Sequence, residues 1–302
     1  MKQERDIKSR RRQKQKVRNS IRILIYGFLF CGLCYGLFCG ISSFGHWDLG
    51  RTPRDKVSGT GNAKMNDQNQ TNDKSADVLN EKLNALIEED SSLQIIMDHR
   101  EDYPDQLVYL LVHNKETKKF VLNYPKVKDL KTDFTIQEKE KKQSFPYFLQ
   151  WDSRWGYKNY GEEMISIDGC GPTCMSMVYC GLTKDYNKNP FWMSEFSEKN
   201  GYYTDGATKW DFMTEGAQKL GLKVKQLPLN EDRIIRNLEV GNPIICIMGP
   251  GAFTSKGHFI VLTGVENGKI IVHDPNSIER TEKLWDFEEF SSQVRNLWVY
   301  WK

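Results

Sequence analysis

Charged residues are absent from one 22-residue stretch of the sequence, residues 23–44. A helix of that length spans a hydrocarbon core of roughly 30 Å. The stretch is longer than the apolar core of a cleaved signal peptide, which has roughly 7–15 residues, and no convincing small-residue cleavage site follows it. The lack of charge therefore predicts a transmembrane signal anchor at residues 23–44.

The residues that precede this stretch are strongly basic. Residues 1–22 contain ten Lys and Arg residues against two Asp and Glu residues. A basic tail is also found in nucleic-acid-binding proteins, but the apolar span behind it favours the membrane, and we expect no nucleic-acid partner. Because positive residues stay on the cytoplasmic side, we expect a single-pass cell-membrane protein with a cytoplasmic N-terminus and an extracellular remainder.

Apolar residues are scarce in residues 45–75, which are rich in Gly, Asn, Asp, Gln, Ser, Thr and Lys. Such a segment buries too little surface to offset the entropy of ordering it. We therefore interpret it as a flexible linker. A helical period returns after it, with Ser75 as the expected N-cap. The apolar positions that carry this period are Leu79, Leu83, Leu86 and Ile87.

Two further helical segments are expected before the next connector, one from Pro104 and one over residues 116–123. Together with the first helix they form a helical prefix and connector over residues 76–144. No residue type in this region points to chemistry. A packing scaffold is the favoured role, and a substrate-recognition arm is the alternative.

The residues most suggestive of chemistry are Asp-Gly-Cys-Gly-Pro-Thr-Cys at positions 168–174. Gly169 and Gly171 allow a tight backbone turn around the cysteine, and Pro172 suits the first turn of a helix. Cys170 is therefore expected just ahead of a helix N-terminus, where the unpaired amides favour thiolate over thiol. This pattern predicts that Cys170 is a nucleophile.

A partner base follows 88 positions later, at His258. The apolar, β-branched run after His258 predicts a buried strand. Asn267-Gly268 predicts a hairpin turn, and a second strand over residues 269–273 ends at Asp274. Such a hairpin can bring Asp274 beside His258, where a carboxylate would orient the imidazole and stabilise the imidazolium.

Two choices stay open at this level. Asn276 rivals Asp274 as the residue that orients His258. Cys174 rivals Cys170 as the nucleophile, although its helix position indicates burial, which raises a thiol pKa. Cys174 and Cys246 lie in apolar runs and are expected to be buried and reduced.

A zinc site is also conceivable, but its spacing is poor. The available ligands are Cys170, Cys174, His258 and His273. Two cysteines four residues apart across a helix start, with two histidines on one hairpin, do not form a good tetrahedral set. We therefore expect no metal and no cofactor.

The order of elements indicates the fold class. Helices come first and an antiparallel sheet follows, which is the order of an α+β domain. We expect helices from Pro172, from Pro190, over 207–220 and over 231–240, and strands over 222–227, 243–248 and 297–301.

Three motifs carry a family resemblance: Asp-Gly-Cys-Gly-Pro-Thr, Gly-His-Phe-Ile-Val and His-Asp-Pro-Asn. Together with the Phe-Pro-Tyr-Phe-Leu-Gln-Trp segment from residue 145, they resemble the bacteriocin-processing (double-glycine leader) peptidases and their stand-alone relatives. That group belongs to the papain-like cysteine peptidases, so the resemblance implies a papain-like fold over residues 145–302. It also implies that Gln150 supplies an oxyanion-hole amide beside a backbone N–H near Cys170. No ATP-binding cassette follows, so coupling to peptide export is not implied.

These observations predict a membrane-anchored extracytoplasmic cysteine peptidase that acts on a peptide or protein through Cys170, His258 and Asp274, with Gln150 as oxyanion donor. The alternatives are a cell-wall peptide amidase on the same fold and a catalytically idle binding module. The expected organisation is a basic tail, an anchor, a linker, a helical prefix and a peptidase domain, at residues 1–22, 23–44, 45–75, 76–144 and 145–302.

Overall fold

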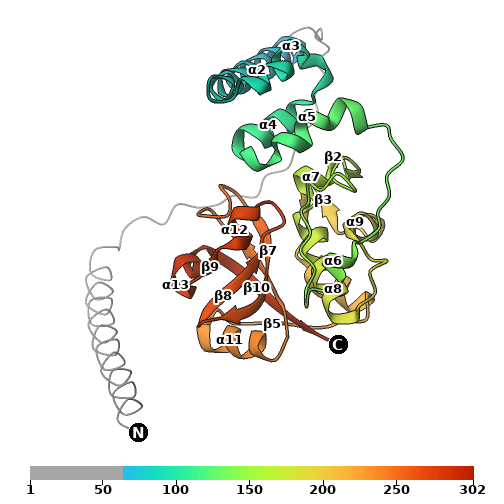
Figure 1. Cartoon of the computed structure of the whole chain (residues 1–302), viewed down its shortest axis with the longest axis vertical. Coiled ribbons are helices and arrows are strands. Elements are labelled where there is room, and N and C mark those ends of the chain that lie inside the picture. Colours follow the sequence, from blue (N-terminus) through green and yellow to red (C-terminus); the bar gives the residue numbers. More distant parts are fainter. Residues whose placement is uncertain (1–63) are drawn as a thin grey trace, which may run out of the picture. The chain divides into compact units, whose positions relative to one another are not determined.

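The computed structural model describes residues 64–302 of the chain (Figure 1). The basic tail, the signal anchor expected at residues 23–44 and most of the expected linker lie outside the described residues. Within the described part, every helix is either too short or too polar to cross a membrane.

The first described helix, α2, extends from Lys64 to Glu89. It begins well before the expected cap at Ser75, so the end of the segment predicted to be a linker is helical. The physical reason is that adding a residue to a formed helix costs far less than nucleating one. The C-terminal half of α2 is fixed by packing, since Leu79, Leu83 and Leu86 are buried as their period indicated.

Short helices complete the prefix after α2. They are η1 (Ser91–Leu93), α3 (Gln94–Asp98), η2 (Arg100–Asp102), α4 (Asp105–His113), η3 (Lys115–Thr117), α5 (Lys118–Val127) and α6 (Glu138–Lys141). The side chain of Asn114 caps η3 by accepting a hydrogen bond from the N–H of Glu116. The prefix shares one apolar cluster with the following domain, because Trp151, Met164 and Ile167 pack against its leucines.

A six-stranded antiparallel sheet dominates the remainder of the chain, in the order β5-β10-β6-β7-β8-β9. The strands are β5 (Lys223–Gln226), β6 (Ile244–Met248), β7 (His258–Glu266), β8 (Lys269–His273), β9 (Leu284–Trp285) and β10 (Val294–Trp301). The β7–β8 turn has the predicted geometry, with positive φ at Asn267 (52°) and Gly268 (80°). His258 begins β7, and β8 runs back along β7 and ends at His273, directly before Asp274.

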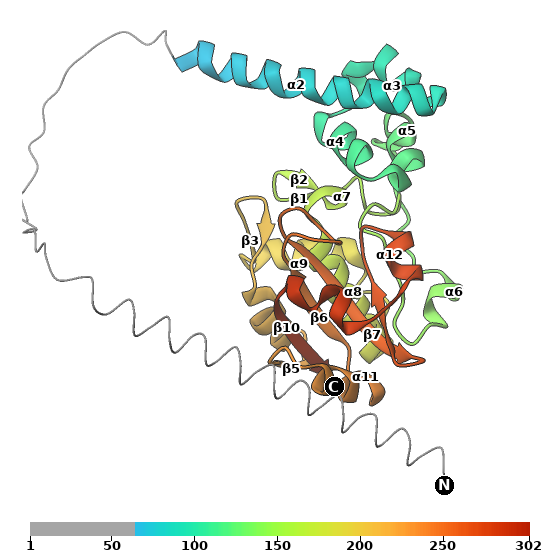
Figure 2. The same ribbon diagram turned by 90° about the vertical axis from the view of Figure 1, so that its left-hand side faces the viewer.

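Both faces of this sheet are covered. Alternate residues of β6 enter different apolar clusters: Ile245 and Ile247 face one side, while Ile244, Cys246 and Met248 face the other. This separation follows from the two-residue period of a strand. Helices α8 (Cys170–Thr183) and α9 (Pro190–Lys199) cover the first face, and α11 (Glu231–Glu239) packs on the second (Figures 1 and 2).

The remaining elements are short. They are β1 (Asn159–Tyr160), β2 (Glu163–Met164), α7 (Ile165–Asp168), β3 (Tyr203–Thr204), β4 (Ala207–Thr208), the π-helix η4 (Phe212–Gly216), α10 (Ala217–Lys219), α12 (Ile278–Glu282), α13 (Phe287–Phe290) and η5 (Ser291–Gln293). With helices first and an antiparallel sheet after them, the α+β class is confirmed.

The helix predicted over residues 207–220 is wrong in its first half. A small hairpin, β3–β4, stands there instead, and helical structure begins only at Phe212. Asp205 and Gly206 form its turn with positive φ values of 48° and 73°. An Asp-Gly pair is a hairpin signal, and the helical period of the following residues obscured it.

Candidate active site

Cys170 is the first residue of α8, and Gly169 occupies the N-cap position. The helix thus begins two residues before the predicted start at Pro172. The flanking glycines serve close packing rather than a positive φ. An added Cβ at Gly171 would lie 2.7 Å from Oγ1 of Thr208, and one at Gly169 would lie 2.3 Å from the carbonyl oxygen of Ile165. Only glycine allows α7 and β4 to approach the cysteine this closely.

His258 and Asp274 form a hydrogen-bonded pair on the sheet side. Nε2 of His258 lies 2.7 Å from Oδ1 of Asp274. His258 is the first residue of β7, and Asp274 directly follows β8, so the hairpin brings them together. The exposed fractions of the two residues are 7% and 0%. A buried pair of this kind holds the imidazole in one orientation.

Each member of this pair favours the charged form of the other. Burial alone would disfavour the imidazolium, but the Asp274 carboxylate and the nearby Cys170 sulfur outweigh that effect and raise the pKa of His258 to about 10. Burial likewise opposes ionisation of Asp274, yet His258 and Arg280 keep the pKa of Asp274 below its ordinary value. Nε of Arg280 donates to the second carboxylate oxygen of Asp274 at 2.5 Å.

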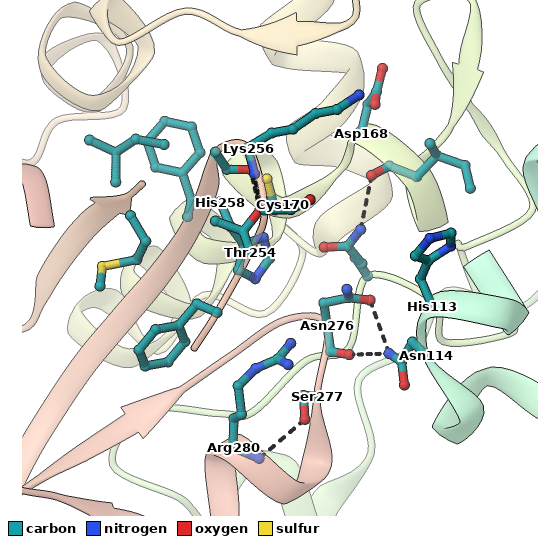
Figure 3. A pocket seen from close by; sticks show the side chains of 18 of the residues that line it. His113, Asn114, Asp168, Cys170, Thr254, Lys256, His258, Asn276, Ser277 and Arg280 are labelled. Carbon is teal, nitrogen blue, oxygen red and sulfur yellow. Dashed lines mark hydrogen bonds between the residues drawn. The ribbon is translucent and has the colours of Figure 1, made fainter. Parts of the chain in front are cut away.

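The sulfur of Cys170 faces this pair across the cleft. Figure 3 shows Cys170 directly beside His258. Because Nε2 of His258 is directed at Asp274, Nδ1 is the ring nitrogen left for the cysteine. Cys170 is only partly buried and lines the cleft.

The rival cysteine has a different environment. Cys174 is fully buried, and its thiol donates to the carbonyl oxygen of Phe259 at 3.3 Å. Burial raises the pKa of Cys174 well above its ordinary value. All four cysteines of the described residues are free of disulfides, and Cys180 and Cys246 are buried as well.

Gln150 reaches the same cleft, but its amide is already bonded. Nε2 donates to the carbonyl oxygens of Ser166 at 2.8 Å and Ile167 at 3.1 Å. Oε1 is buried without a hydrogen-bond partner. Both amide hydrogens are thus used within the protein, so an oxyanion would have to compete for one of them. The backbone N–H of Gln150 donates to the carbonyl oxygen of Pro275 at 2.7 Å, which ties this segment to the residue after Asp274.

Asn276, the rival third residue, makes its hydrogen bonds with residues other than His258. Its carbonyl oxygen accepts from Nδ2 of Asn114 at 2.6 Å and from Nε1 of Trp151 at 3.2 Å. Its side-chain oxygen lies 3.4 Å from the same Nδ2. The carboxylate of Asp274, and not the amide of Asn276, is therefore the group that His258 contacts.

An open cleft of about 1140 Å³ surrounds these residues. One side is formed by Gln150, Asp168 and Cys170, and another by the loop before His258. The prefix contributes a third side through Tyr109, Leu110, His113, Asn114, Lys115 and Glu116. Sequence reasoning missed this third side because the prefix residues carry no chemical motif.

Asp168 is a second residue that sequence reasoning did not single out. It lines the cleft two positions before Cys170, and Oδ2 accepts a hydrogen bond from the hydroxyl of Tyr203 at 2.9 Å. Burial, the largest effect, together with the Glu163 charge, raises the pKa of Asp168 to about 6 even though the Tyr203 bond lowers it. Among the described residues, no cationic nitrogen lies within salt-bridge distance of Asp168. Figure 3 shows Lys256 extending across the cleft towards it.

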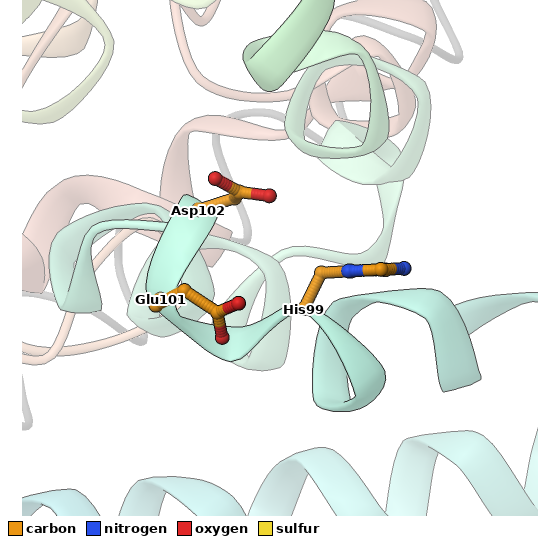
Figure 4. A group of neighbouring side chains, drawn as sticks. All are labelled: His99, Glu101 and Asp102. Carbon is orange, nitrogen blue, oxygen red and sulfur yellow. The ribbon is translucent and has the colours of Figure 1, made fainter.

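The residues of the conceivable zinc site do not gather as a ligand set in the described part of the chain. The group there with suitable donors is His99, Glu101 and Asp102, whose ligand atoms lie within 4.8 Å of one another (Figure 4). All three side chains are exposed on the prefix, and none of them lines the cleft. Exposed acidic groups are hydrated by water and are common without a metal ion, so the arrangement does not indicate a metal.

An α+β fold with a cysteine, a histidine and a carboxylate around one cleft is typical of papain-like cysteine peptidases. Sequence comparison agrees with that class, because a profile of the Peptidase_C39 like family matches residues 142–302, more than half of the chain. The chain therefore belongs to the Peptidase_C39 like family and is a cysteine peptidase, as its three motifs predicted.

Solved structures of two similar proteins can be compared with it. The peptidase domain of Streptococcus ComA, a bifunctional ABC transporter of a quorum-sensing pathway, is 22% identical, with 43% of this chain and 88% of that chain covered and a TM-score of 0.32. A C39-like peptidase from Bacillus anthracis is 15% identical, with 52% and 94% covered and a TM-score of 0.35. No curated protein sequence matches the chain.

Proposed function

We propose that this protein is a membrane-anchored, extracytoplasmic cysteine peptidase that hydrolyses peptide bonds through Cys170, His258 and Asp274. The observation that carries the proposal is the position of His258, which lies between the sulfur of Cys170 and the carboxylate of Asp274. A histidine whose raised pKa keeps it protonated is suited to pair with a thiolate and then to protonate a leaving amine.

In the first half of the reaction, the Cys170 thiolate attacks the carbonyl carbon of the scissile bond. The C=O π electrons move to the oxygen, which becomes an oxyanion. When this tetrahedral species collapses, the C–N bond breaks and His258 donates its proton to the departing amine. The products are a free amine and a thioester between the substrate carbonyl and Cys170.

In the second half, neutral His258 accepts a proton from a water molecule that attacks the thioester. Collapse of the second tetrahedral species breaks the C–S bond, releases the product as a carboxylic acid that loses its proton to the solvent, and restores the thiolate–imidazolium pair. Asp274 stabilises the imidazolium in both halves without taking up the proton.

The oxyanion has two candidate donors. One is the N–H of Cys170, because the first N–H groups of a helix have no partner within that helix. The other is Nε2 of Gln150, which must release one of its bonds to Ser166 or Ile167 to reach the oxyanion. Two such donors are the usual composition of an oxyanion hole.

A direct test uses a papain-type epoxide inhibitor on the protein, followed by mapping of the alkylated residue. We expect labelling of Cys170 and loss of hydrolysis of a mixture of unstructured peptides. Hydrolysis of isolated cell-wall peptide bridges without hydrolysis of those peptides would assign the amidase alternative. Absence of both labelling and turnover would assign the idle binding module.

The membrane part of the proposal rests on the basic tail and the uncharged span at residues 23–44. The span functions as a signal anchor that leaves the tail in the cytoplasm and the peptidase domain outside the cell. Protease added to intact cells should then degrade the domain and spare the tail. Protection of the domain in that assay would contradict extracytoplasmic placement.

A further inference from the structure

One corner of the prefix, residues 114–117, contacts the segment that follows the Asp274 carboxylate. Oε1 of Glu116 accepts a hydrogen bond from the hydroxyl of Ser277 at 2.6 Å, and Oε2 accepts one from the N–H of Ile278 at 2.6 Å. Asn114 donates to the carbonyl oxygen of Asn276, as Figure 3 shows. Three consecutive residues of the peptidase domain are thus held by two residues that lie outside the region matched by the family.

This contact continues to the buried pair through helix α12. Ser277 is the N-cap of α12, and its side chain accepts the N–H of Arg280 at 3.1 Å. Arg280 in turn donates to Oδ2 of Asp274 at 2.5 Å, while the N–H of Asn276 donates to Oδ1 at 2.8 Å. Displacement of the residues around Ser277 therefore moves two of the groups that orient the carboxylate.

We propose that Glu116 is a positioning residue of the active site, which holds Asp274 against His258 through Ser277 and Ile278. The prefix is then a working part of the peptidase rather than a separate scaffold. This inference rests on the function proposed above, because it assigns Glu116 a role through the Cys170–His258–Asp274 site.

Glu116 is not needed simply to attach the prefix to the peptidase domain, because other contacts attach it. The rings of Phe120 and Tyr157 stack with centroids 4.1 Å apart, and the hydroxyl of Tyr157 donates to the carbonyl oxygen of Phe120 at 2.7 Å. Trp151 and Ile167 also pack into the apolar cluster of the prefix. A single change of Glu116 to Gln leaves these contacts intact. It removes the charge and turns one acceptor into a donor that faces the N–H of Ile278 or the hydroxyl of Ser277.

The test measures the alkylation rate of Cys170 by iodoacetamide as a function of pH, which requires no natural substrate. An ordinary thiol with a pKa of roughly 8.5 hardly reacts at about pH 6–7, so the rate in this range reports the thiolate–imidazolium pair. With Glu116→Gln we expect a rate about 3- to 10-fold lower than in the wild type, because a less well placed Asp274 stabilises the imidazolium, and with it the thiolate, less strongly, and about 1.4 kcal/mol of lost stabilisation is a factor of about ten. Glu89→Gln is the matched control, since the contact of Glu89 is with Lys115 inside the prefix.

Thermal unfolding of each variant is measured alongside. Glu116→Asp keeps the charge and should restore at least part of the rate, which a purely structural role would not require. A double-mutant cycle of Glu116→Gln with Ser277→Ala should be non-additive, because both changes break the same contact. If Glu116→Gln fails to fold, the comparison of Glu116→Asp with Ser277→Ala takes its place, and both should lower the rate.

The inference is overturned if Cys170 of Glu116→Gln reacts at the wild-type rate over the whole pH range, or if the cycle with Ser277→Ala is additive. Its failure is distinct from failure of the proposed function. In that second case the wild-type protein itself would show no enhanced reactivity of Cys170 at about pH 6–7, whatever residue stands at position 116.

Discussion

Two of the three sides of the cleft, the helical wall with Cys170 and the sheet wall with His258 and Asp274, hold these residues in different ways. On the helical wall, the backbone at the start of α8 places Cys170, which is only partly buried. On the sheet wall, Asp274 is fully buried, and its carboxylate accepts hydrogen bonds from His258, Arg280 and the N–H of Asn276. Cys170 is thus partly open to the cleft, whereas His258 and Asp274 are held in a buried hydrogen-bond network. Substitutions on the two walls should therefore fail in different ways.

The largest expected effect separates the two cysteines of the helical wall. Cys170→Ser should be inactive and should not be labelled by iodoacetamide at about pH 6, because hydroxyl oxygen is a far weaker nucleophile than thiolate. Cys174→Ala should remain active, with a modest loss of thermal stability from the small cavity. Peptide hydrolysis and mass spectrometry of the labelled protein check both expectations. The opposite labelling pattern would move the nucleophile to Cys174.

The next effect concerns the network of the sheet wall. His258→Ala should abolish turnover, because the proton donor and acceptor is lost. Asp274→Asn should lower kcat by roughly 10²–10⁴-fold and leave measurable activity, because the histidine and the thiol remain. The pH–rate profile should change as well. In the wild type, activity should persist until His258 loses its proton near its pKa of about 10, and this alkaline limb should move to lower pH in Asp274→Asn because the carboxylate charge is gone.

Asn276 is the control for that assignment. Its side chain contacts Asn114 rather than His258, so Asn276→Ala should reduce kcat less than Asp274→Asn and leave the alkaline limb in place. A harsher effect of Asn276→Ala on kcat would show that the third member of the triad is the amide.

A smaller effect is expected for Gln150, which lies at the base of the helical wall. If its amide turns to the oxyanion during the reaction, Gln150→Ala should lower kcat by roughly 10²–10³-fold with little change in KM. Gln218→Ala, at an exposed position of α10, is the matched control. Loss of thermal stability with an unchanged kcat would instead make Gln150 a structural clamp on Ser166 and Ile167.

The smallest effect concerns the charge of Asp168 on the same wall. The pKa of Asp168 is raised to about 6, so the carboxylate is ionised above that pH and neutral below it. A peptide with a Lys beside the scissile bond should bind about three- to fivefold less tightly in Asp168→Asn, which corresponds to about 1 kcal/mol. In the wild type the same loss should develop as the pH falls through 6. KM values for the Lys peptide and a Gln analogue, with Asp211→Asn as the control, check this, and equal KM values for both peptides would contradict it.

Local patterns predicted the elements that depend on neighbouring residues. The turn at Asn267-Gly268, the strands β6, β7 and β8 and helix α11 follow their sequence signals closely. The hairpin at Asp205-Gly206 was missed because an equally local helical period competed with it. The start of α8 lies two residues before the predicted one, and the close approach of Thr208 to Gly171 there is a contact between distant segments that no local pattern predicts.

For the site, the sequence by itself determined which residue types were available and in what order: Cys170, His258 and Asp274 within three motifs. It left Asp274 and Asn276 as rivals, since both follow β8 and only the direction of each side chain separates them. Only the tertiary structure decided that direction. It also decided that the amide of Gln150 is bonded to Ser166 and Ile167, and that Glu116 contacts Ser277 and Ile278. These features depend on which atoms meet after folding, and a hydrogen bond across 161 positions of sequence, such as that between Glu116 and Ser277, leaves no periodic pattern in the chain.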